Sequence, residues 1–202
     1  MTCFIALCLV AAGLIAGVQA AAIEPNLRLI QATPAVTLRT FPGEGAYLDL
    51  GLYLAAVDAP FEVELSRPDY TMPVVVTQML ATDSGGVEPR VLPSDILDGW
   101  SGFKDFMSVR IADPDGKVLR EFTTTFCPNN ERQRLNDSGP TQPTFVDGCR
   151  ANPFTRGFAW GIEQGWATNL MGYSEQPMPL KRGRYVVTTS IAPRCLLFHF
   201  LK

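Results

Sequence analysis

The sequence predicts an all-β protein: an immunoglobulin-like antiparallel β-sandwich of seven to nine strands, with one disulfide, after an N-terminal signal peptide. Apolar residues recur at intervals of two rather than three or four. The chain contains 17 Gly and 16 Pro, together 33 of 202 residues, and no segment after residue 22 keeps a helical period. Since Gly and Pro favour tight turns, this composition is typical of many short strands joined by short connections.

Half-buried strands are expected where apolar and polar residues alternate, at 27–31, 36–39 and 61–66. The run at 71–80 contains three consecutive valines and is typical of a strand in a sandwich core. Pro73 predicts that this strand enters at an edge or a bulge, because proline cannot donate a hydrogen bond to a neighbouring strand.

The clearest hairpin signal is Asp113-Pro114-Asp115-Gly116 between the strand segments 106–112 and 117–126. Proline stands at the first central turn position, and glycine supplies the positive φ that follows. A short turn is expected at 93–97, with Ser94 as its N-cap. Tyr185 precedes a β-branched strand, where a tyrosine of an immunoglobulin-like sandwich bonds back to the preceding corner.

The first 22 residues have the features of a secretory signal peptide. An apolar run from Cys3 to Val18 ends in small residues, and cleavage is expected after Ala20 or Ala22. The segment has no Lys or Arg, and its length comes close to a bilayer span, so an uncleaved membrane anchor is the alternative. We expect a secreted, extracellular protein that contacts a membrane only through this segment if it is uncleaved.

Cleavage leaves three cysteines, Cys127, Cys149 and Cys195. In an oxidising compartment Cys127 and Cys149 are expected to form a disulfide around a polar loop. Zinc is disfavoured because the chain has one histidine and no C-x-x-C pair. Cys195 is then left over, either as a free thiol or as a partner in an intermolecular bond.

Charge argues against a nucleic-acid partner. The chain has 17 Lys and Arg against 20 Asp and Glu, a formal net charge of −3, and its basic residues form no run longer than Lys181-Arg182. No aromatic residues are interleaved with basic ones, as they would be on a nucleic-acid platform.

The sequence contains no complete set of catalytic side chains for any of the enzyme classes considered. The segment 172–176 lacks the second glycine of a nucleophile elbow, and Cys195 and His199 lie in a terminal tail without fixed geometry. Glu163 and several aspartates could supply paired carboxylates, but their separation is not visible in a sequence. The loop aspartates lack the register of a calcium site and are explained by turn chemistry. We therefore assign no catalytic residue, metal ligand or cofactor to this chain.

Binding residues are expected in the aromatic, glycine-rich stretch that follows Cys149. Aromatic rings at a sandwich edge can stack on sugars or anchor a protein interface, and charged side chains lie beside them. For Trp160 the alternative is packing in the core, as for the central tryptophan of immunoglobulin domains. The candidate binding residues are Arg156, Trp160, Glu163, Trp166 and Tyr173.

Four segments together resemble the N-terminal region of secreted actinobacterial proteins of the lysyl oxidase family. They are LRLIQATPAVTLRTFPGEGAYLDLGLYLAA, FCPNNERQRLNDSGP, NPFTRGFAWGIEQGWA and RGRYVVTTSIAP, which span Leu27 to Pro193. The resemblance implies that a second domain follows, one that binds copper through a His-x-His-x-His cluster and carries a quinone derived from tyrosine and lysine. Here His199 is the single histidine, so no catalytic residue carries over.

These observations divide the chain into a signal peptide (1–22), a β-sandwich domain (23–193) and an anomalous tail (194–202). The tail shows no alternation and would expose an apolar end, so we expect a truncated or frame-shifted end, with a terminal edge strand as the alternative. The expected function is a secreted, non-catalytic module that binds or positions an extracellular protein, a glycan or a missing oxidase domain. Two alternatives are the truncated front of a copper-dependent protein-lysine (amine) oxidase and a carbohydrate-binding module.

Overall fold

The computed structural model describes residues 21–36, 38, 40–149, 154–171 and 177–198, and in this part of the chain the protein consists of antiparallel strands without an α-helix. The all-β prediction is therefore confirmed. The described residues form fourteen strands, more than the seven to nine expected. The excess arises because four strands are pieces of only two or three residues.

A five-stranded sheet has β7 at its centre. One edge of β7 pairs with β8. The other edge pairs with β6 along residues 75–78 and with β1 along residues 81–82, and β12 pairs with β6 on its far side. The strands are β1 (Ala22–Ile23), β6 (Phe61–Ser66), β7 (Val75–Thr82), β8 (Val87–Leu92) and β12 (Gly157–Ile162).

A three-stranded sheet contains the predicted hairpin, formed by β9 (Phe103–Ala112) and β10 (Val118–Phe126), with β14 (Val186–Ile191) on the other side of β9. The amide of Gly116 donates to the carbonyl of Asp113 at 3.0 Å, and Gly116 has φ = 86°. The predicted turn is confirmed, since this φ is one that glycine adopts without strain.

The remaining strands form a four-stranded sheet of order β11-β13-β5-β2 and a separate small hairpin, β3-β4. They are β2 (Leu27–Gln31), β3 (Thr40–Phe41), β4 (Gly45–Ala46), β5 (Leu52–Ala56), β11 (Arg132–Arg134) and β13 (Trp166–Asn169).

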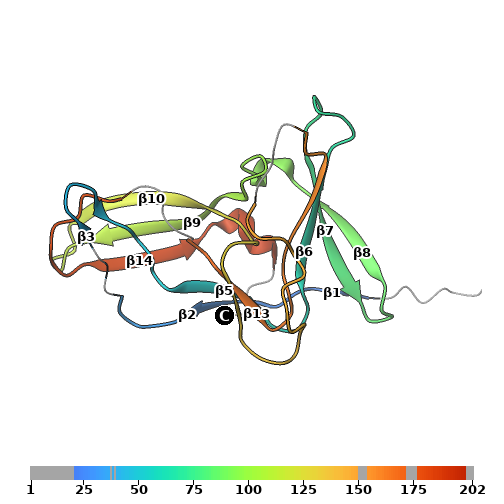
Figure 1. The fold of residues 1–202 in the computed structure, drawn as a ribbon, viewed down its shortest axis with the longest axis horizontal. Coiled ribbons are helices and arrows are strands. Elements are labelled where there is room, and N and C mark those ends of the chain that lie inside the picture. Colours follow the sequence, from blue (N-terminus) through green and yellow to red (C-terminus); the bar gives the residue numbers. More distant parts are fainter. Residues whose placement is uncertain (1–20, 37, 39, 150–153, 172–176, 199–202) are drawn as a thin grey trace, which may run out of the picture.

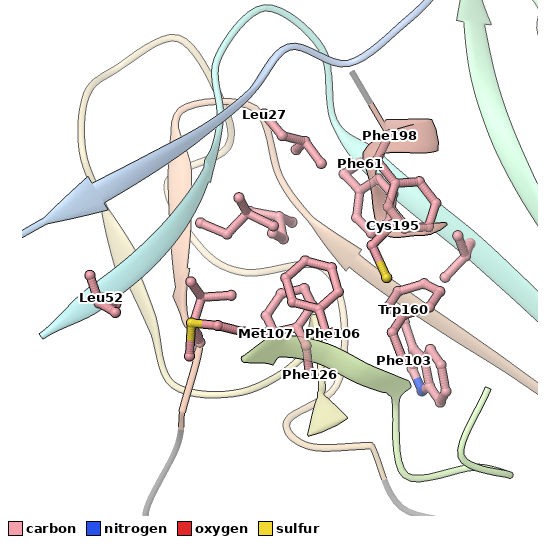
Figure 2. Close-up of a cluster of buried hydrophobic side chains, with 14 of the residues drawn as sticks. Leu27, Leu52, Phe61, Phe103, Phe106, Met107, Phe126, Trp160, Cys195 and Phe198 are labelled. Atoms are coloured by element: carbon pink, nitrogen blue, oxygen red, sulfur yellow. The ribbon is translucent and has the colours of Figure 1, made fainter. Parts of the chain in front are cut away.

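Figure 1 shows β9, β10 and β14 lying over β2 and β5, while β6, β7 and β8 run steeply across the other end of the molecule. Side chains from all three sheets meet in one core (Figure 2). Trp160, Phe61, Phe103, Phe106 and Phe126 are its largest fully buried members from the strands. The predicted alternation of 61–66 is confirmed, because the side chains of β6 are buried at every second position.

The segment after Pro193 corrects a sequence-based expectation. It forms a 3₁₀ helix, η2 (Pro193–Phe198), rather than an edge strand. Cys195 and Phe198 are 0 % and 1 % exposed, so they do not form an exposed apolar end. The Phe198 ring lies 5.0 Å from that of Phe61 and 5.1 Å from that of Phe103, which places it between two sheets. The packed body therefore extends past the expected boundary at residue 193.

Three smaller expectations are wrong. Val36 and Leu38 lie outside any strand. Strand β7 begins two residues after Pro73, so that proline lies in the preceding loop and occupies neither an edge nor a bulge. The turn at 93–97 is the 3₁₀ helix η1 (Ser94–Ile96), but its N-cap is Pro93 and no side chain bonds to its first turn.

The described residues contain no helix that is both long and apolar enough to cross a membrane.

Candidate binding site

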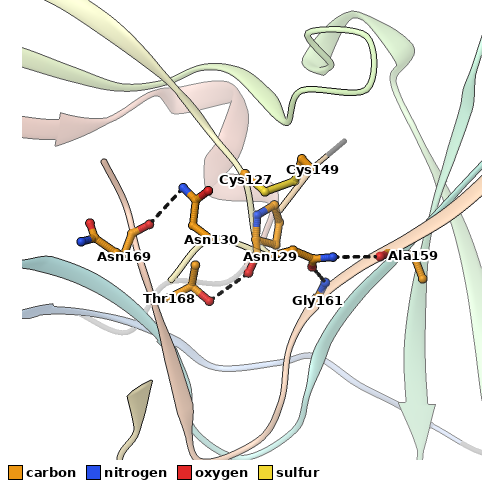
Figure 3. The surroundings of a disulfide bond; sticks show 9 residues. Cys127, Asn129, Asn130, Cys149, Ala159, Gly161, Thr168 and Asn169 are labelled. Carbon is orange, nitrogen blue, oxygen red and sulfur yellow. Dashed lines mark hydrogen bonds between the residues drawn. A yellow bond between two sulfur atoms is a disulfide. The ribbon is translucent and has the colours of Figure 1, made fainter. Parts of the chain in front are cut away.

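The disulfide between Cys127 and Cys149 is present, with the two Cα atoms 5.6 Å apart (Figure 3). Asn129, two residues further along, is fully buried and bridges to β12. Its side-chain amide donates to the carbonyl of Ala159 at 3.1 Å and accepts from the amide of Gly161 at 2.8 Å. The disulfide region is thus joined to the sheet through backbone groups on both sides of Trp160.

Glu163 holds the middle of the disulfide loop against β12. Its Oε1 accepts hydrogen bonds from the amide and hydroxyl of Thr144 and from the amide of Phe145, at 2.5, 3.1 and 3.2 Å. Its partner Arg132 lies 3.6 Å away and donates to the carbonyl of Phe145 at 2.8 Å. With 4 % of its side chain exposed, Glu163 anchors a loop and does not face solvent.

The two predicted tryptophans are also buried. Trp160 is 0 % exposed and its ring lies 5.8 Å from that of Phe103, edge to face, so it belongs to the core. Trp166 is 6 % exposed and its indole N–H donates to the carbonyl of Pro140 at 2.9 Å, which fastens the disulfide loop at a second point. Tyr173 lies outside the described residues.

Arg156 is the one described member of the predicted set that lies exposed. It precedes β12 and meets the loop that joins β6 to β7, where its guanidinium donates to the carbonyl of Pro68 and lies 5.9 Å from the ring of Tyr70. Around this contact lies a surface group that we call the aromatic–arginine cluster. Its members are Arg67, Tyr70, Trp100, Phe154 and Arg156.

Arg67 holds the cluster together. Its Nε donates to the carbonyl of Thr155 at 2.9 Å and its Nη1 to that of Tyr70 at 2.8 Å. Its guanidinium carbon lies 5.5 Å from the ring of Tyr70 and 5.6 Å from that of Trp100, both within cation–π range. The Tyr70 and Phe154 rings meet edge to face at 6.2 Å. The Arg67 guanidinium therefore contacts three separate loops, which carry Tyr70, Trp100 and Thr155.

The turn that presents Tyr70 is closed by Asp69. The amide and hydroxyl of Thr71 each donate to its Oδ1 at 2.9 Å. These two hydrogen bonds, with smaller contributions from Arg156 and Arg67, lower the pKa of the Asp69 carboxyl below its ordinary value. The carboxylate is thus charged at neutral pH and closes the turn through these two hydrogen bonds.

The outer rings of the cluster are exposed although they make these contacts. Tyr70 is 50 % and Phe154 is 77 % exposed, and Met72 on the same loop is 51 % exposed. Large rings that are held in place yet open to solvent are typical of interface anchors, because little conformational entropy is lost on binding.

An apolar sheet face begins next to this loop. Directly paired residues of neighbouring strands share a face, so the register places the outward side chains of β7 and β8 together. Val87 and Val91 are 60 % and 69 % exposed there, and Val75 is 41 % exposed. Pro89 lies on the same strand and offers no amide to a further strand, which favours contact through the face rather than the edge.

Sequence reasoning missed Arg67, Tyr70 and Trp100. The signal that could have found two of them is Arg67-Pro68-Asp69-Tyr70, a turn motif that carries an arginine and an aromatic residue between two strands. Trp100 carries no local signal, because only the fold brings its loop to the others.

No described group of three or more His, Cys, Asp and Glu residues is arranged to hold a metal ion. His199, the single histidine, lies outside the described residues. The lysyl oxidase resemblance places its copper ligands in a second domain, and the described residues supply no such set. Within the described part of the chain, the cluster offers cations, rings and carbonyl oxygens, which are groups for recognition.

Comparison with known proteins leaves the family open: no protein-family model, no curated protein and no solved structure matches this chain. The lysyl oxidase resemblance stays a prediction.

Proposed function

We propose that this chain is a secreted, non-catalytic β-sandwich module that binds an extracellular protein through the aromatic–arginine cluster. The observation that carries the proposal is the exposure of Tyr70 and Phe154 on loops that Arg67 and Arg156 hold in place. Arginine, tyrosine and methionine are enriched at the centres of protein interfaces. The disulfide adds support for an extracellular setting, since such bonds persist in oxidising compartments.

A protein partner fits the geometry better than a glycan. Sugars stack on an open ring face, but the Tyr70 ring already has two guanidinium groups within 6 Å and a phenyl edge against it. The neighbouring valines of β7 and β8 are apolar and offer no hydrogen bonds to sugar hydroxyls. An apolar area beside fixed aromatic and arginine side chains is the usual anatomy of a protein interface.

The immunoglobulin-like architecture belongs to this proposal. Tyr185 donates from its hydroxyl to the carbonyl of Lys181, the bond back to the preceding corner that the sequence predicted. Trp160 is buried beside strand residues that Asn129 ties to the disulfide region. Both features support kinship with immunoglobulin-like sandwiches, where a corner tyrosine and a core tryptophan recur.

Site-specific photo-cross-linking tests the binding proposal. A benzophenone amino acid replaces Phe154 in the secreting cells, and the matched control carries it at Phe41, an exposed phenylalanine of β3 outside the cluster. We expect one dominant cross-linked protein from position 154 that is absent from position 41, and Tyr70→Ala should abolish it. Identical products from both positions would contradict the proposal, as would glycan-array binding that is lost with Tyr70→Ala.

A role in front of an oxidase domain is the second proposal, supported by the sequence resemblance. The nucleotide sequence past the codon for Lys202, translated in all three frames, distinguishes the two. A downstream His-x-His-x-His cluster would support the oxidase, whereas a stop codon followed by an unrelated gene would contradict it.

A further inference from the structure

A pocket of about 840 Å³ lies between strands β2 and β5 on one side and β14 on the other. In Figure 1 this is the end of the molecule where β14 begins, away from the loop that joins β6 to β7. None of the residues of the aromatic–arginine cluster lines it. The volume falls in the range of small-molecule sites, about 300–1,000 Å³.

The inner wall of the pocket is apolar. Leu50 and Leu52 form part of it and are each 7 % exposed, so the pocket reaches the surface of the core. Leu180, Tyr185 and Val187 line it as well and pack against the same core. A hydrocarbon chain placed against these side chains would leave water, which stabilises the bound state by roughly 25 cal/mol per Å² of apolar surface.

The rim is cationic. Lys181, Arg182 and Arg184 line the pocket within four consecutive positions, and none of its described lining residues is Asp or Glu. The ion pairs of the described residues involve none of these three side chains. The bond from the Tyr185 hydroxyl to the carbonyl of Lys181 fixes the turn that carries them. Three neighbouring positive charges repel one another, and an anion at the rim would relieve that repulsion.

We infer that this pocket binds a single-chain amphiphile with an anionic head group, such as a long-chain carboxylic acid. The hydrocarbon chain lies against Leu50 and Leu52, and the head group meets Arg182 and Arg184 in charge-assisted hydrogen bonds. A neutral alcohol of the same length satisfies only the wall, and a small anion satisfies only the rim. This site is independent of the proposed protein interface.

Calorimetric titration of the oxidised protein with dodecanoate below its micelle concentration tests the inference. Dodecanol, butyrate and inorganic phosphate serve as probes of the wall and the rim alone. We expect dodecanoate to bind about tenfold or more tightly than each of the three, because only dodecanoate contacts both the apolar wall and the cationic rim. Equal affinity for dodecanol or for phosphate would overturn the inference.

Charge reversal at the rim gives the second arm. Arg182→Glu with Arg184→Glu should weaken dodecanoate binding about tenfold or more and leave dodecanol binding unchanged. Lys117→Glu with Arg120→Glu is the matched control, because both residues are exposed, lie outside the pocket lining and change the net charge by the same amount. Equal loss of dodecanoate binding in both double variants would mean that net charge alone attracts the anion, and the rim site would be rejected. All four residues are exposed, so the variants should fold, and thermal unfolding verifies this.

Discussion

Gly161 and Gly157 lie on the same strand, β12, yet alanine should affect them in opposite ways. A Cβ at Gly161 would lie 2.3 Å from Cζ of Phe145 and 2.7 Å from the carbonyl oxygen of Phe61, distances that real Cβ atoms do not show. At Gly157 the nearest atom is the carbonyl oxygen of Leu65 at 3.8 Å, an ordinary contact. The missing side chain at 161 is what lets Phe145 of the disulfide loop rest on the sheet.

The size of each change in the free energy of unfolding follows from the space around the added Cβ. Overpacking costs about 1–3 kcal/mol at Gly161, where the backbone carbonyl cannot yield and Phe145 must move. Gly157→Ala should stabilise the protein by about 0.4–1 kcal/mol, because it restricts the unfolded chain without a clash. The two variants should therefore differ by about 1.5–4 kcal/mol in the free energy of unfolding.

Urea unfolding followed by tryptophan fluorescence measures this difference, with equal m-values as the sign that the unfolded states are comparable. Limited proteolysis between residues 135 and 147 gives a local readout. Because Phe145 is displaced, Gly161→Ala should be cleaved there faster than Gly157→Ala. If the two variants unfold at the same urea concentration and are cleaved equally fast, the disulfide loop does not rest on β12 and the reasoning is refuted.

Three further predictions concern the cysteines and the N-terminus. Replacing Cys127 and Cys149 by alanine should lower the free energy of unfolding by about 3.4 kcal/mol, the loop-entropy value for their separation of 22 residues, as urea unfolding of the oxidised protein and the double variant will measure. Burial raises the pKa of the Cys195 thiol to about 11 from 9.0, so a thiol reagent at pH 8 should label it only after unfolding, and rapid labelling of the native protein would contradict its burial. The free energy of unfolding should fall as the pH rises from about 9 to about 11, because the thiol ionises first in the unfolded chain. We predict that the expected signal peptide is cleaved after residue 20, because Ala21 then stays as the N-terminus, with its nitrogen 3.2 Å from a carboxylate oxygen of Asp83, and β1 stays whole. The intact mass of the protein recovered from the culture medium distinguishes this site from cleavage two residues later.

Local chemistry explains the parts of the fold that the sequence predicted. The hairpin at Asp113 to Gly116 depends on one turn, whose hydrogen bonds involve residues at most four apart. The alternation in β6 reflects a strand with one buried face. The disulfide was predicted from the spacing of its two cysteines and from an expected oxidising compartment. The turn and the strand are decided by interactions within a short segment, and the disulfide is decided by the number and spacing of the cysteines.

The binding residues could not be predicted in the same way, because burial depends on contacts far apart in the chain. Glu163 stands beside aromatic residues and suggests an exposed charge, but its three hydrogen-bond donors come from positions 18 and 19 residues earlier. Arg67 receives its role from a carbonyl 88 residues away. Pattern analysis identifies a charged or aromatic residue, but it does not show which face that residue occupies.

The tail misled the sequence analysis for a related reason. A search for strands expects apolar residues at every second position, whereas a 3₁₀ helix has three residues per turn and brings positions i and i+3 to one face. Cys195 and Phe198 are three apart, and both are buried.

The position of Phe198 also explains how one small core can support two separate binding regions. Its ring contacts Phe61 of the five-stranded sheet and Phe103 of the three-stranded sheet, so it connects the end with the aromatic–arginine cluster to the sheet that contributes β14 to the pocket (Figure 2). The charged rim of the pocket and the outer part of the cluster, by contrast, are exposed loop side chains: Arg182, Arg184, Tyr70, Phe154 and Arg156. Because these side chains lie outside the core, replacing them should alter binding without altering the fold. Phe198→Ala, by contrast, should lower the free energy of unfolding by about 3–5 kcal/mol and so weaken both regions together.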